Sequence, residues 1–358
     1  MTKLKILAWP ASSTANRYTE ALYANMPGVS VEDFAPGWRT LLRMARKNYD
    51  VFHIHWLERA FWRDSKLAII RAVCVALLAA AMIKLRGGVV VWTAHDPAPH
   101  HMQGNSFAQP GFFSVLWKVY SNLLTRMLDG IILLSGTHRD PLIKARPYLA
   151  KRPFAVTPHP HFKSVYANHI SRSDARHRLA LPGESTVLLL IGTIRPYKNA
   201  EALIDAFREL PGENLRLVIA GQPDSDSYAE TLKARVGSDS RILLAFSFIA
   251  DDELQLFLNA ADAVVIPFKN ATNSGSVALA LSFAKPVAVP DMPVFREVQD
   301  IVGTDWIRLM PDGLTQGALE DVVTWLRQPR PPEPNLDALD WQQIAGQTVK
   351  FFQDIRAL

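Results

Sequence analysis

The chain has 358 residues, of which 49% are hydrophobic and 20% are charged, and its formal net charge is +5. It is too long for one ordinary hydrophobic core and suits two α/β domains, and its composition excludes long disorder or a fibrous repeat. The positive charge fits a nucleotide diphosphate, an acidic lipid surface or nucleic acid. Because the sequence lacks zinc-finger spacing and a basic, aromatic-rich sheet signature, we expect no nucleic acid partner.

The first half alternates short apolar runs with helical stretches, which is typical of a parallel sheet with crossover helices. The runs cover residues 3–9, 49–56, 87–95 and 129–135. Ligands meet such sheets at the carboxyl ends of the strands. The polar and aromatic residues that end these runs are therefore expected on one rim: His53, His55, Trp56, His95 and Asp96.

Residues 66–84 form the most apolar helical segment of the sequence. Arg71 interrupts it, and the uninterrupted part, residues 72–83, is too short to span a membrane. Two interpretations remain open: a crossover helix buried on both sides, or a helix in a membrane interface with its basic residues near phospholipid headgroups. Cys74, the one cysteine, lies in this apolar run and is predicted to be a buried structural thiol.

The sequence TAHDPAPHH, at residues 93–101, follows an apolar strand of the first half. A hydroxyl group that acts as a nucleophile must lose its proton, and a carboxylate or an imidazole at a cleft rim can accept that proton. Asp96 and His95 are therefore the candidate catalytic residues. Asp96 precedes a proline, so a turn role explains it equally well.

Histidines also cluster at residues 53–56, 100–101 and 159–161, and a zinc site is one possible explanation. None of these clusters has the H-E-x-x-H spacing, and they follow different strands. We therefore favour hydrogen bonding to sugars and expect no metal site. The D-x-D pattern at residues 224–226 is interpreted as turn or helix-capping chemistry.

The second half repeats the strand and helix alternation, with apolar runs that begin at residues 185, 214, 241, 262 and 285. It predicts a second doubly wound sheet. We expect a first domain at residues 1–165 and a second at 166–335. A final helix at 336–358 follows a proline-rich link and packs back on the first domain.

Two turns in the second half suit a diphosphate. In IGTIRPYKN, residues 191–199, a strand ends in a glycine turn, and Arg195 and Lys198 precede a helix whose amino end favours an anion. In TNSGS, residues 272–276, small residues let the backbone approach a phosphate, and Ser274 and Ser276 offer hydroxyls. Solvated cations and ordinary helix capping are the alternatives. The sequence contains neither G-x-G-x-x-G nor the P-loop motif, which disfavours dehydrogenases and P-loop enzymes.

Five motifs in order make the sequence resemble the GT-B glycosyltransferases, in particular bacterial exopolysaccharide transferases similar to the xanthan β-mannosyltransferase. They are HIHW, TAHDPAPH, HPHF, GTIRPYK and NSGSVALALS, and the resemblance runs through most of the chain. It implies an α/β fold of two Rossmann-like domains that face each other across a cleft. It also implies transfer without a metal or other cofactor.

The resemblance assigns roles to three sets of residues. Asp96 and His95 are expected to be catalytic, and His55, Trp56 and His100 are expected to bind the acceptor. The expected donor-binding residues are His159, Arg195, Lys198, Asn273, Ser274, Gly275 and Ser276.

One departure from the larger GT-B families narrows the resemblance. Those families carry two glutamates eight positions apart, where this sequence has Ala271 and Leu279. Neither side chain can bind ribose or the sugar, which favours the exopolysaccharide subgroup. It also favours inversion over retention at the anomeric carbon.

The leading hypothesis is transfer of a hexose from a GDP- or UDP-linked donor, for example mannose from GDP-mannose. The acceptor is a polyprenyl-diphosphate-linked glycan, and the enzyme is expected to be cytoplasmic and peripheral on the inner, anionic face of the cell membrane. A nucleotide-sugar epimerase and a degenerate, non-catalytic nucleotide-binding subunit are the alternatives.

Overall fold

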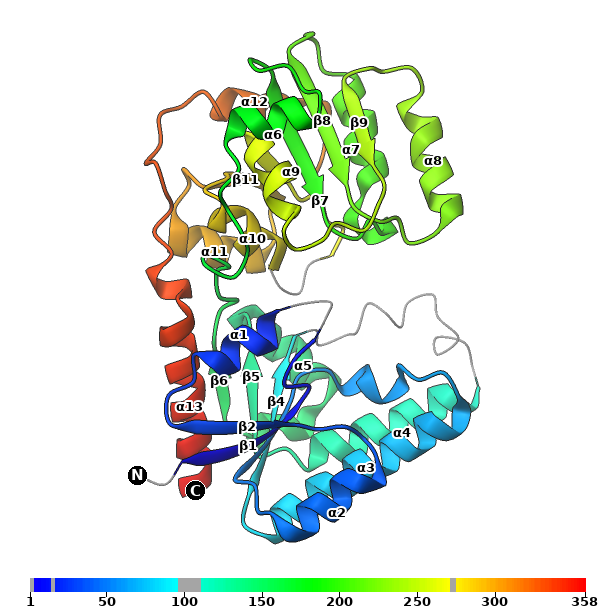
Figure 1. Cartoon of the computed structure of the whole chain (residues 1–358), viewed down its shortest axis with the longest axis vertical. Coiled ribbons are helices and arrows are strands. Elements are labelled where there is room, and N and C mark those ends of the chain that lie inside the picture. Colours follow the sequence, from blue (N-terminus) through cyan, green and yellow to red (C-terminus); the bar gives the residue numbers. More distant parts are fainter. Residues whose placement is uncertain (1–2, 14–16, 96–110, 271–274) are drawn as a thin grey trace. The chain divides into compact units, whose positions relative to one another are not determined.

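The computed structural model describes residues 3–13, 17–95, 111–270 and 275–358 (Figure 1). The chain forms two compact units. The first consists of Met1–Pro158 and Leu339–Leu358, and the second of His159–Ala338. The sequence places the division near residue 165, whereas the structure places it at residue 158.

The first unit is built on a six-stranded parallel sheet with the order β2-β1-β3-β4-β5-β6. Its strands are β1 (Leu4–Trp9), β2 (Val29–Asp33), β3 (Val51–Ile54), β4 (Val89–Ala94), β5 (Gly130–Leu133) and β6 (Phe154–Val156). Its helices are α1 (Tyr18–Ala24), α2 (Trp38–Arg46), α3 (Lys66–Leu85), α4 (Phe112–Arg126), α5 (Arg139–Ala145) and α13 (Trp341–Ala357). Short 3₁₀ helices cover Leu57–Phe61, Gly136–His138 and Pro147–Lys151.

The second unit repeats this design with the strand order β12-β11-β10-β7-β8-β9. Its strands are β7 (Thr186–Ile191), β8 (Leu215–Ala220), β9 (Ile242–Ala245), β10 (Ala263–Val265), β11 (Val287–Pro290) and β12 (Ile307–Met310). Its helices are α6 (Arg172–Arg178), α7 (Ala200–Arg208), α8 (Asp226–Val236), α9 (Leu254–Ala260), α10 (Gly275–Ser282), α11 (Pro293–Val302) and α12 (Gln316–Trp325). A 3₁₀ helix, η5, covers Pro196–Lys198, and another covers Asp337–Leu339. The predicted α/β class with two Rossmann-like sheets is confirmed.

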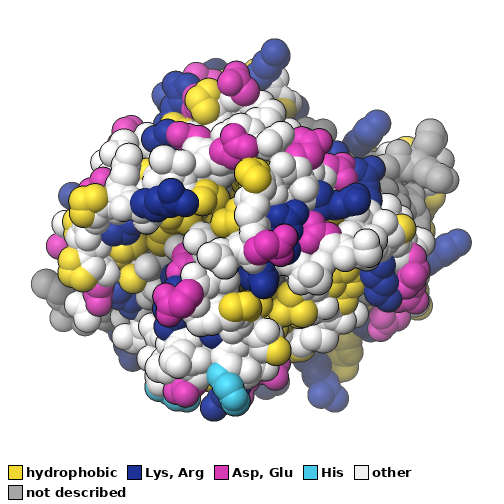
Figure 2. Space-filling view, turned by 90° about the horizontal axis from the view of Figure 1, so that it is seen from above, with side chains coloured by type: hydrophobic (Ala, Val, Ile, Leu, Met, Phe, Trp, Pro, Cys, Tyr) yellow, Lys and Arg dark blue, Asp and Glu magenta, His cyan; other side chains and the backbone are white. Residues whose placement is uncertain are grey.

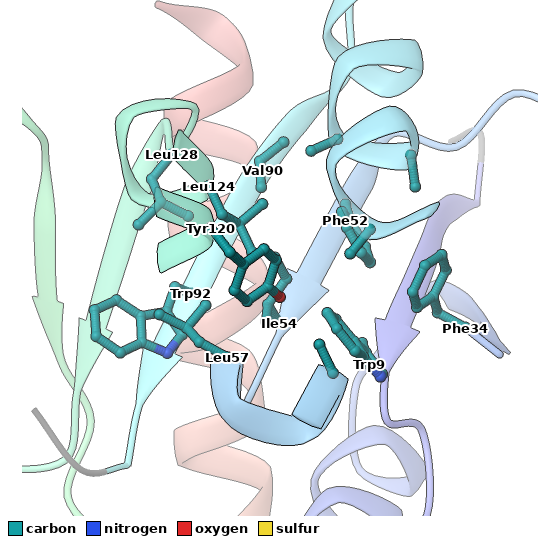
Figure 3. Close-up of a cluster of buried hydrophobic side chains, with 14 of the residues drawn as sticks. Trp9, Phe34, Phe52, Ile54, Leu57, Val90, Trp92, Tyr120, Leu124 and Leu128 are labelled. Atoms are coloured by element: carbon teal, nitrogen blue, oxygen red, sulfur yellow. The ribbon is translucent and has the colours of Figure 1, made fainter. Parts of the chain in front are cut away.

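The inner strands are mostly apolar because helices cover both faces of a parallel sheet. All six residues of β4 are buried, as are all four of β3. Successive side chains point to opposite faces. Phe52 and Ile54 pack under α3 and α4 (Figure 3), whereas His53 lies on the other face, against Phe352 of α13. The apolar pattern therefore decides which strand-end residues reach each face.

Helix α3 lies across one face of the first sheet and packs against α2 and α4. Its amino end is capped by Ser65, whose Oγ accepts a hydrogen bond from the Ala68 amide at 3.3 Å. The helix is long and apolar enough to cross a membrane, yet 44% of its most apolar window is buried in the protein. The prediction that Cys74 is buried is wrong: Cys74 is exposed, because α3 buries its opposite side.

Helix α13 returns from the second unit and packs on the first sheet (Figure 1). Phe352 is fully buried and contacts the His53 ring, with centroids 5.0 Å apart, and Arg356 pairs with Asp50 at 2.8 Å. Gly130 on β5 lets α13 approach closely, because a Cβ there would collide with the side chain of Ile355. The chain terminus is therefore part of the core of the first unit.

Replacing Phe352 with alanine should lower the free energy of unfolding of the first unit by about 3–5 kcal/mol, because it removes a buried aromatic ring and leaves a cavity. Chemical denaturation followed by tryptophan fluorescence measures this loss. Gln353→Ala, at an exposed position of the same helix, is the matched control and should change the stability little. Equal stability of the two variants would show that α13 is not an integral part of the unit.

Candidate functional site

Both sheets have a switch point, where successive strands run outward to opposite sides. In the first sheet it lies between β1 and β3, and in the second between β7 and β10. Ligands of doubly wound proteins bind beyond the carboxyl ends of the strands at such points. The predicted site residues that the structure describes gather at these two places, one in each unit.

A chain of buried side chains lies at the switch point of the first sheet. His53 Nε2 lies 2.7 Å from Thr93 Oγ1, and its Nδ1 lies 2.7 Å from the Tyr23 hydroxyl. The same hydroxyl lies 2.8 Å from His55 Nε2, and His55 Nδ1 lies 2.9 Å from His95 Nε2. Four hydrogen bonds thus connect β3, β4 and α1, and we call this set of five residues the histidine chain.

Two imidazoles of the histidine chain, His53 and His55, are held neutral. Burial lowers the pKa of His53 to about 3. Burial, with the neighbouring His53, His95 and Arg59, holds the pKa of His55 well below its usual value. Burial disfavours the charged form of each ring, so the neutral forms are favoured.

A neutral imidazole has one donor nitrogen and one acceptor nitrogen. With all three rings neutral and the Tyr23 hydroxyl donating to one of its two histidine neighbours, the histidine chain has two consistent arrangements. In one, His95 Nε2 donates to His55, His55 donates to Tyr23, Tyr23 donates to His53 and His53 donates to Thr93. In the other, every bond is reversed. Only the first leaves a lone pair on His95 Nδ1, so the buried residues decide whether His95 can act as a base.

Aromatic rings enclose the end of the histidine chain. Trp56 stacks on His95 with ring centroids 4.5 Å apart, and Tyr18 meets His95 edge-on at 4.9 Å. Trp341 of α13 lies 5.7 Å from Tyr18. These contacts fix the orientation of the His95 ring. In the chain, His95 directly precedes residue 96.

The structure describes only some of the site residues predicted for the first unit. His95 and Trp56 lie together, and both nitrogens of His55 are hydrogen-bonded to protein groups. Asp96 and His100 lie outside the described residues. The sequence analysis does not identify Tyr23, because a tyrosine in a short helix looks like an ordinary core residue. Thr93 begins the TAHDPAPH motif, but the sequence assigns it no role.

A buried lysine lies at the switch point of the second sheet. Lys198 follows β7, is only 6% exposed, and its Nζ donates to the Ile191 carbonyl at 3.3 Å. The Nζ also lies 5.5 Å from the centre of the Phe268 ring, which follows β10. Burial, and then the charge of Arg195, lower its pKa to about 8. Among the described residues, no carboxylate forms an ion pair with it.

The glycine turn after β7 makes room for this ammonium group. Gly192 has a φ of +98°, and a Cβ there would lie 3.0 Å from the Lys198 Nζ. The backbone of Gly192 is also in close contact with Gly221, at the end of β8. A side chain at either glycine would therefore displace the lysine or separate the two strand ends.

Helix α10 begins at Gly275, and the His159 ring lies against the backbone there. A Cβ at Gly275 would be 3.3 Å from His159 Nε2, and His159 Nδ1 lies 2.8 Å from the Pro160 carbonyl oxygen. Burial lowers the pKa of His159 to about 4, so this ring is also neutral. Ser276 lies in the first turn of α10, while Asn273 and Ser274 lie outside the described residues.

The D-x-D pattern serves local structure. Ser225 caps α8 by accepting a hydrogen bond from the Tyr228 amide at 3.2 Å, and Asp226 lies in the first turn, as the capping interpretation predicted. Asp224 pairs with Arg195 at 3.3 Å. In the described part of the chain, no group of three His, Cys, Asp or Glu side chains is arranged to hold a metal ion.

The stability of the first unit should depend on its buried histidines. Their folded-state pKa values lie below the unfolded value near 6.5, so their contribution is complete above that pH and is lost as the pH falls toward 3. When the pH falls from 8 to 5.5, each such histidine is protonated in the unfolded state but not in the folded state. The free energy of unfolding should therefore fall by about 1.4 kcal/mol for each of them.

Denaturation of a His53→Gln variant at both pH values tests this, and the drop between them should be smaller than in the wild type. Val349→Ala, which removes packing but no titrating group, should keep the wild-type drop. An unchanged drop in His53→Gln would contradict the neutral state of this histidine.

Comparison with known proteins agrees with this geometry. Residues 171–300 match the family described as Glycosyl transferases group 1. The fold resembles that of sucrose-phosphate synthase from Thermosynechococcus elongatus, with a TM-score of 0.70, 15% identity and 99% of each chain covered. The second unit therefore matches the group 1 glycosyltransferases, and the chain has the fold of the GT-B glycosyltransferases.

Two further proteins narrow the comparison. The chain is 29% identical over 335 residues to the GDP-mannose:glycolipid 4-beta-D-mannosyltransferase of Xanthomonas campestris pv. campestris, which covers 93% of this chain and 86% of the relative. The Anabaena protein Alr3699/HepE, in complex with UDP-glucose, has a TM-score of 0.63 and 18% identity over 99% of this chain and 98% of its own. The resemblance to GT-B glycosyltransferases is therefore confirmed.

Proposed function

We propose that the protein transfers mannose from GDP-mannose to a lipid-linked glycan, with inversion and without a metal ion. The Xanthomonas relative, which aligns with most of this chain, is named for GDP-mannose and a glycolipid. The second unit binds the donor and the first binds the acceptor. The acceptor class is a glycan on a polyprenyl diphosphate, and the reaction takes place on the cytoplasmic face of the cell membrane.

The observation that carries this proposal is the buried, unpaired ammonium of Lys198. Burying a cation without a counter-charge is costly, and an anion bound beside it offsets that cost. The diphosphate of a nucleotide sugar supplies such an anion, and the amino end of the eight-residue helix α10 adds backbone amides. Arg195 stands beside Lys198 as a second cation, and His159 and residues 273–276 complete the donor site.

The transfer step we propose is a direct displacement. The acceptor hydroxyl oxygen forms a bond to the anomeric carbon, and the bond from that carbon to the phosphate oxygen breaks with its electrons going to the leaving diphosphate. The hydroxyl proton passes to Asp96, with His95 orienting the acceptor or accepting the proton in its place. Lys198 and Arg195 stabilise the charge that develops on the leaving group, which is the role a metal ion has in other transferases.

The acceptor side uses the rings around His95. We propose that Trp56 and His100 contact the acceptor sugar directly. His55 acts through its hydrogen bond to His95, because both of its nitrogens are already engaged with protein groups. Tyr23, His53 and Thr93 keep the His95 ring in the arrangement that leaves Nδ1 unprotonated.

A transfer assay with GDP-mannose and a lipid-linked acceptor extracted from membranes tests the proposed function. Lys198→Met should lower kcat/KM by about tenfold to a hundredfold, because a charge-assisted hydrogen bond to the diphosphate is lost. Methionine fills a similar volume without a buried charge, so the variant should fold. Lys233→Met, at an exposed lysine of α8 paired with Glu230, is the control. Equal loss in both variants, or conversion of the donor without acceptor, would contradict the proposal.

Asp96→Asn should lower kcat by about a hundredfold or more while the affinity for GDP-mannose stays unchanged, since a general base contributes about 10² to 10⁴ in rate. Single-turnover kinetics with a pre-bound donor separate the two effects. Asp140→Asn, at an exposed position of α5, is the matched control. Full turnover by a folded Asp96→Asn enzyme would remove the base assignment.

A further inference from the structure

Three helices on one face of the first sheet differ from the rest of the protein in charge. Helices α2, α3 and α4 contain eight Lys or Arg residues and no Asp or Glu, although the chain has 34 acidic residues in total. On the face shown in Figure 2, by contrast, acidic and basic side chains are interspersed. Helices that carry cations and no carboxylate of their own favour contact with an anionic partner.

The cations on these helices are available for such a partner. Arg43 is paired with Glu32 and Lys84 with Asp129, and Arg126 lies over the Tyr148 ring. The other five have no ion pair or side-chain hydrogen bond among the described residues. They are Arg39, Arg46, Lys66, Arg71 and Lys118.

The same helices carry most of the exposed apolar side chains. Ten of the fourteen large hydrophobic side chains exposed among the described residues lie on α2, α3 or α4. On α4 they form a stripe at helical spacing, namely Phe112, Val115, Val119 and Leu123. Leu67 on α3 is 76% exposed, and Trp38 on α2 is 61% exposed.

Helix α3 cannot serve as a membrane span while the unit stays folded. Its inner side, including Ile69, Val73 and Ile83, belongs to the core cluster with Phe52 and Trp92. Extraction of the helix would expose that cluster to water. Its outer side, with Leu78 and Leu85 exposed between basic residues, can instead lie along a lipid surface.

We propose that the outer face of α2, α3 and α4 docks the first unit on an anionic lipid bilayer, with the apolar side chains in the headgroup region and the five unpaired cations among lipid phosphates. This deepens the proposed function, on which it rests for a lipid-linked acceptor. It assigns the membrane contact to particular residues that take no part in transfer.

Cys74 provides a direct readout, because it is the one cysteine of the chain and is exposed on α3. The full chain, labelled at Cys74 with an environment-sensitive fluorophore, is titrated with vesicles of phosphatidylcholine alone or with 30% phosphatidylglycerol. The emission should shift to the blue only with the anionic vesicles, and less so at high salt. A Cys74→Ser, Gln353→Cys chain, labelled on α13, should show no shift.

Replacing Arg39, Arg46 and Lys118 together with glutamine should weaken vesicle binding on the order of a hundredfold, since each basic residue near such a surface contributes roughly fivefold. Replacing Lys144, Lys151 and Lys350, three exposed lysines elsewhere on the first unit, makes the same charge change and should weaken it far less. Both triple variants should keep wild-type transfer to a water-soluble acceptor, so loss of docking is distinguishable from failure of the proposed function.

Equal weakening by the two triple variants, or equal binding to neutral and anionic vesicles, would overturn the proposal. A fluorescence shift that grows with protein concentration in the absence of lipid would also overturn it, because it would assign this face to a second copy of the chain.

Discussion

The free-energy cost of burying the Lys198 ammonium is the main constraint on the site in the second unit. The group donates one hydrogen bond of 3.3 Å and lies over an aromatic ring, and burial lowers its pKa to about 8. Such an arrangement is stable only because a tight glycine turn holds the lysine against β7 and β10. Burial removes the favourable interaction of the ammonium with water. A diphosphate bound beside the lysine would replace it with a favourable interaction between opposite charges.

The site in the first unit contains buried neutral groups, in contrast to the buried cation of the second unit. Its histidine chain is buried, His53 and His55 are held neutral, and hydrogen bonds connect each member to the next. A buried polar network of this kind is rigid when it is fully satisfied. In the function we propose, the two units have two tasks: one stabilises the negative charge of a leaving group, and the other holds the His95 ring in the orientation needed to receive a proton.

The sequence predicts the parts of this structure that depend on local pattern. Apolar runs and intervening helices indicate two parallel sheets, and strand-to-helix turns locate Arg195, Lys198 and His95, because ligand-binding residues follow strands in this fold. It does not predict Phe268 beneath Lys198 or Tyr23 between two histidines, because those contacts join segments that the sheet order brings together. The exposure of Cys74 was missed for a related reason: α3 is apolar on both sides, so its composition does not reveal which side faces the core.

Equilibrium binding of GDP, measured by calorimetry in the presence of EDTA between pH 7 and 9, tests the central claim most directly. A diphosphate that contacts Lys198 raises its pKa, so affinity should be highest below about pH 8 and fall by up to about tenfold at pH 9. Lys198→Met should bind weakly and lose this dependence. Absence of GDP binding, or an affinity that is independent of both pH and Lys198, would contradict the account.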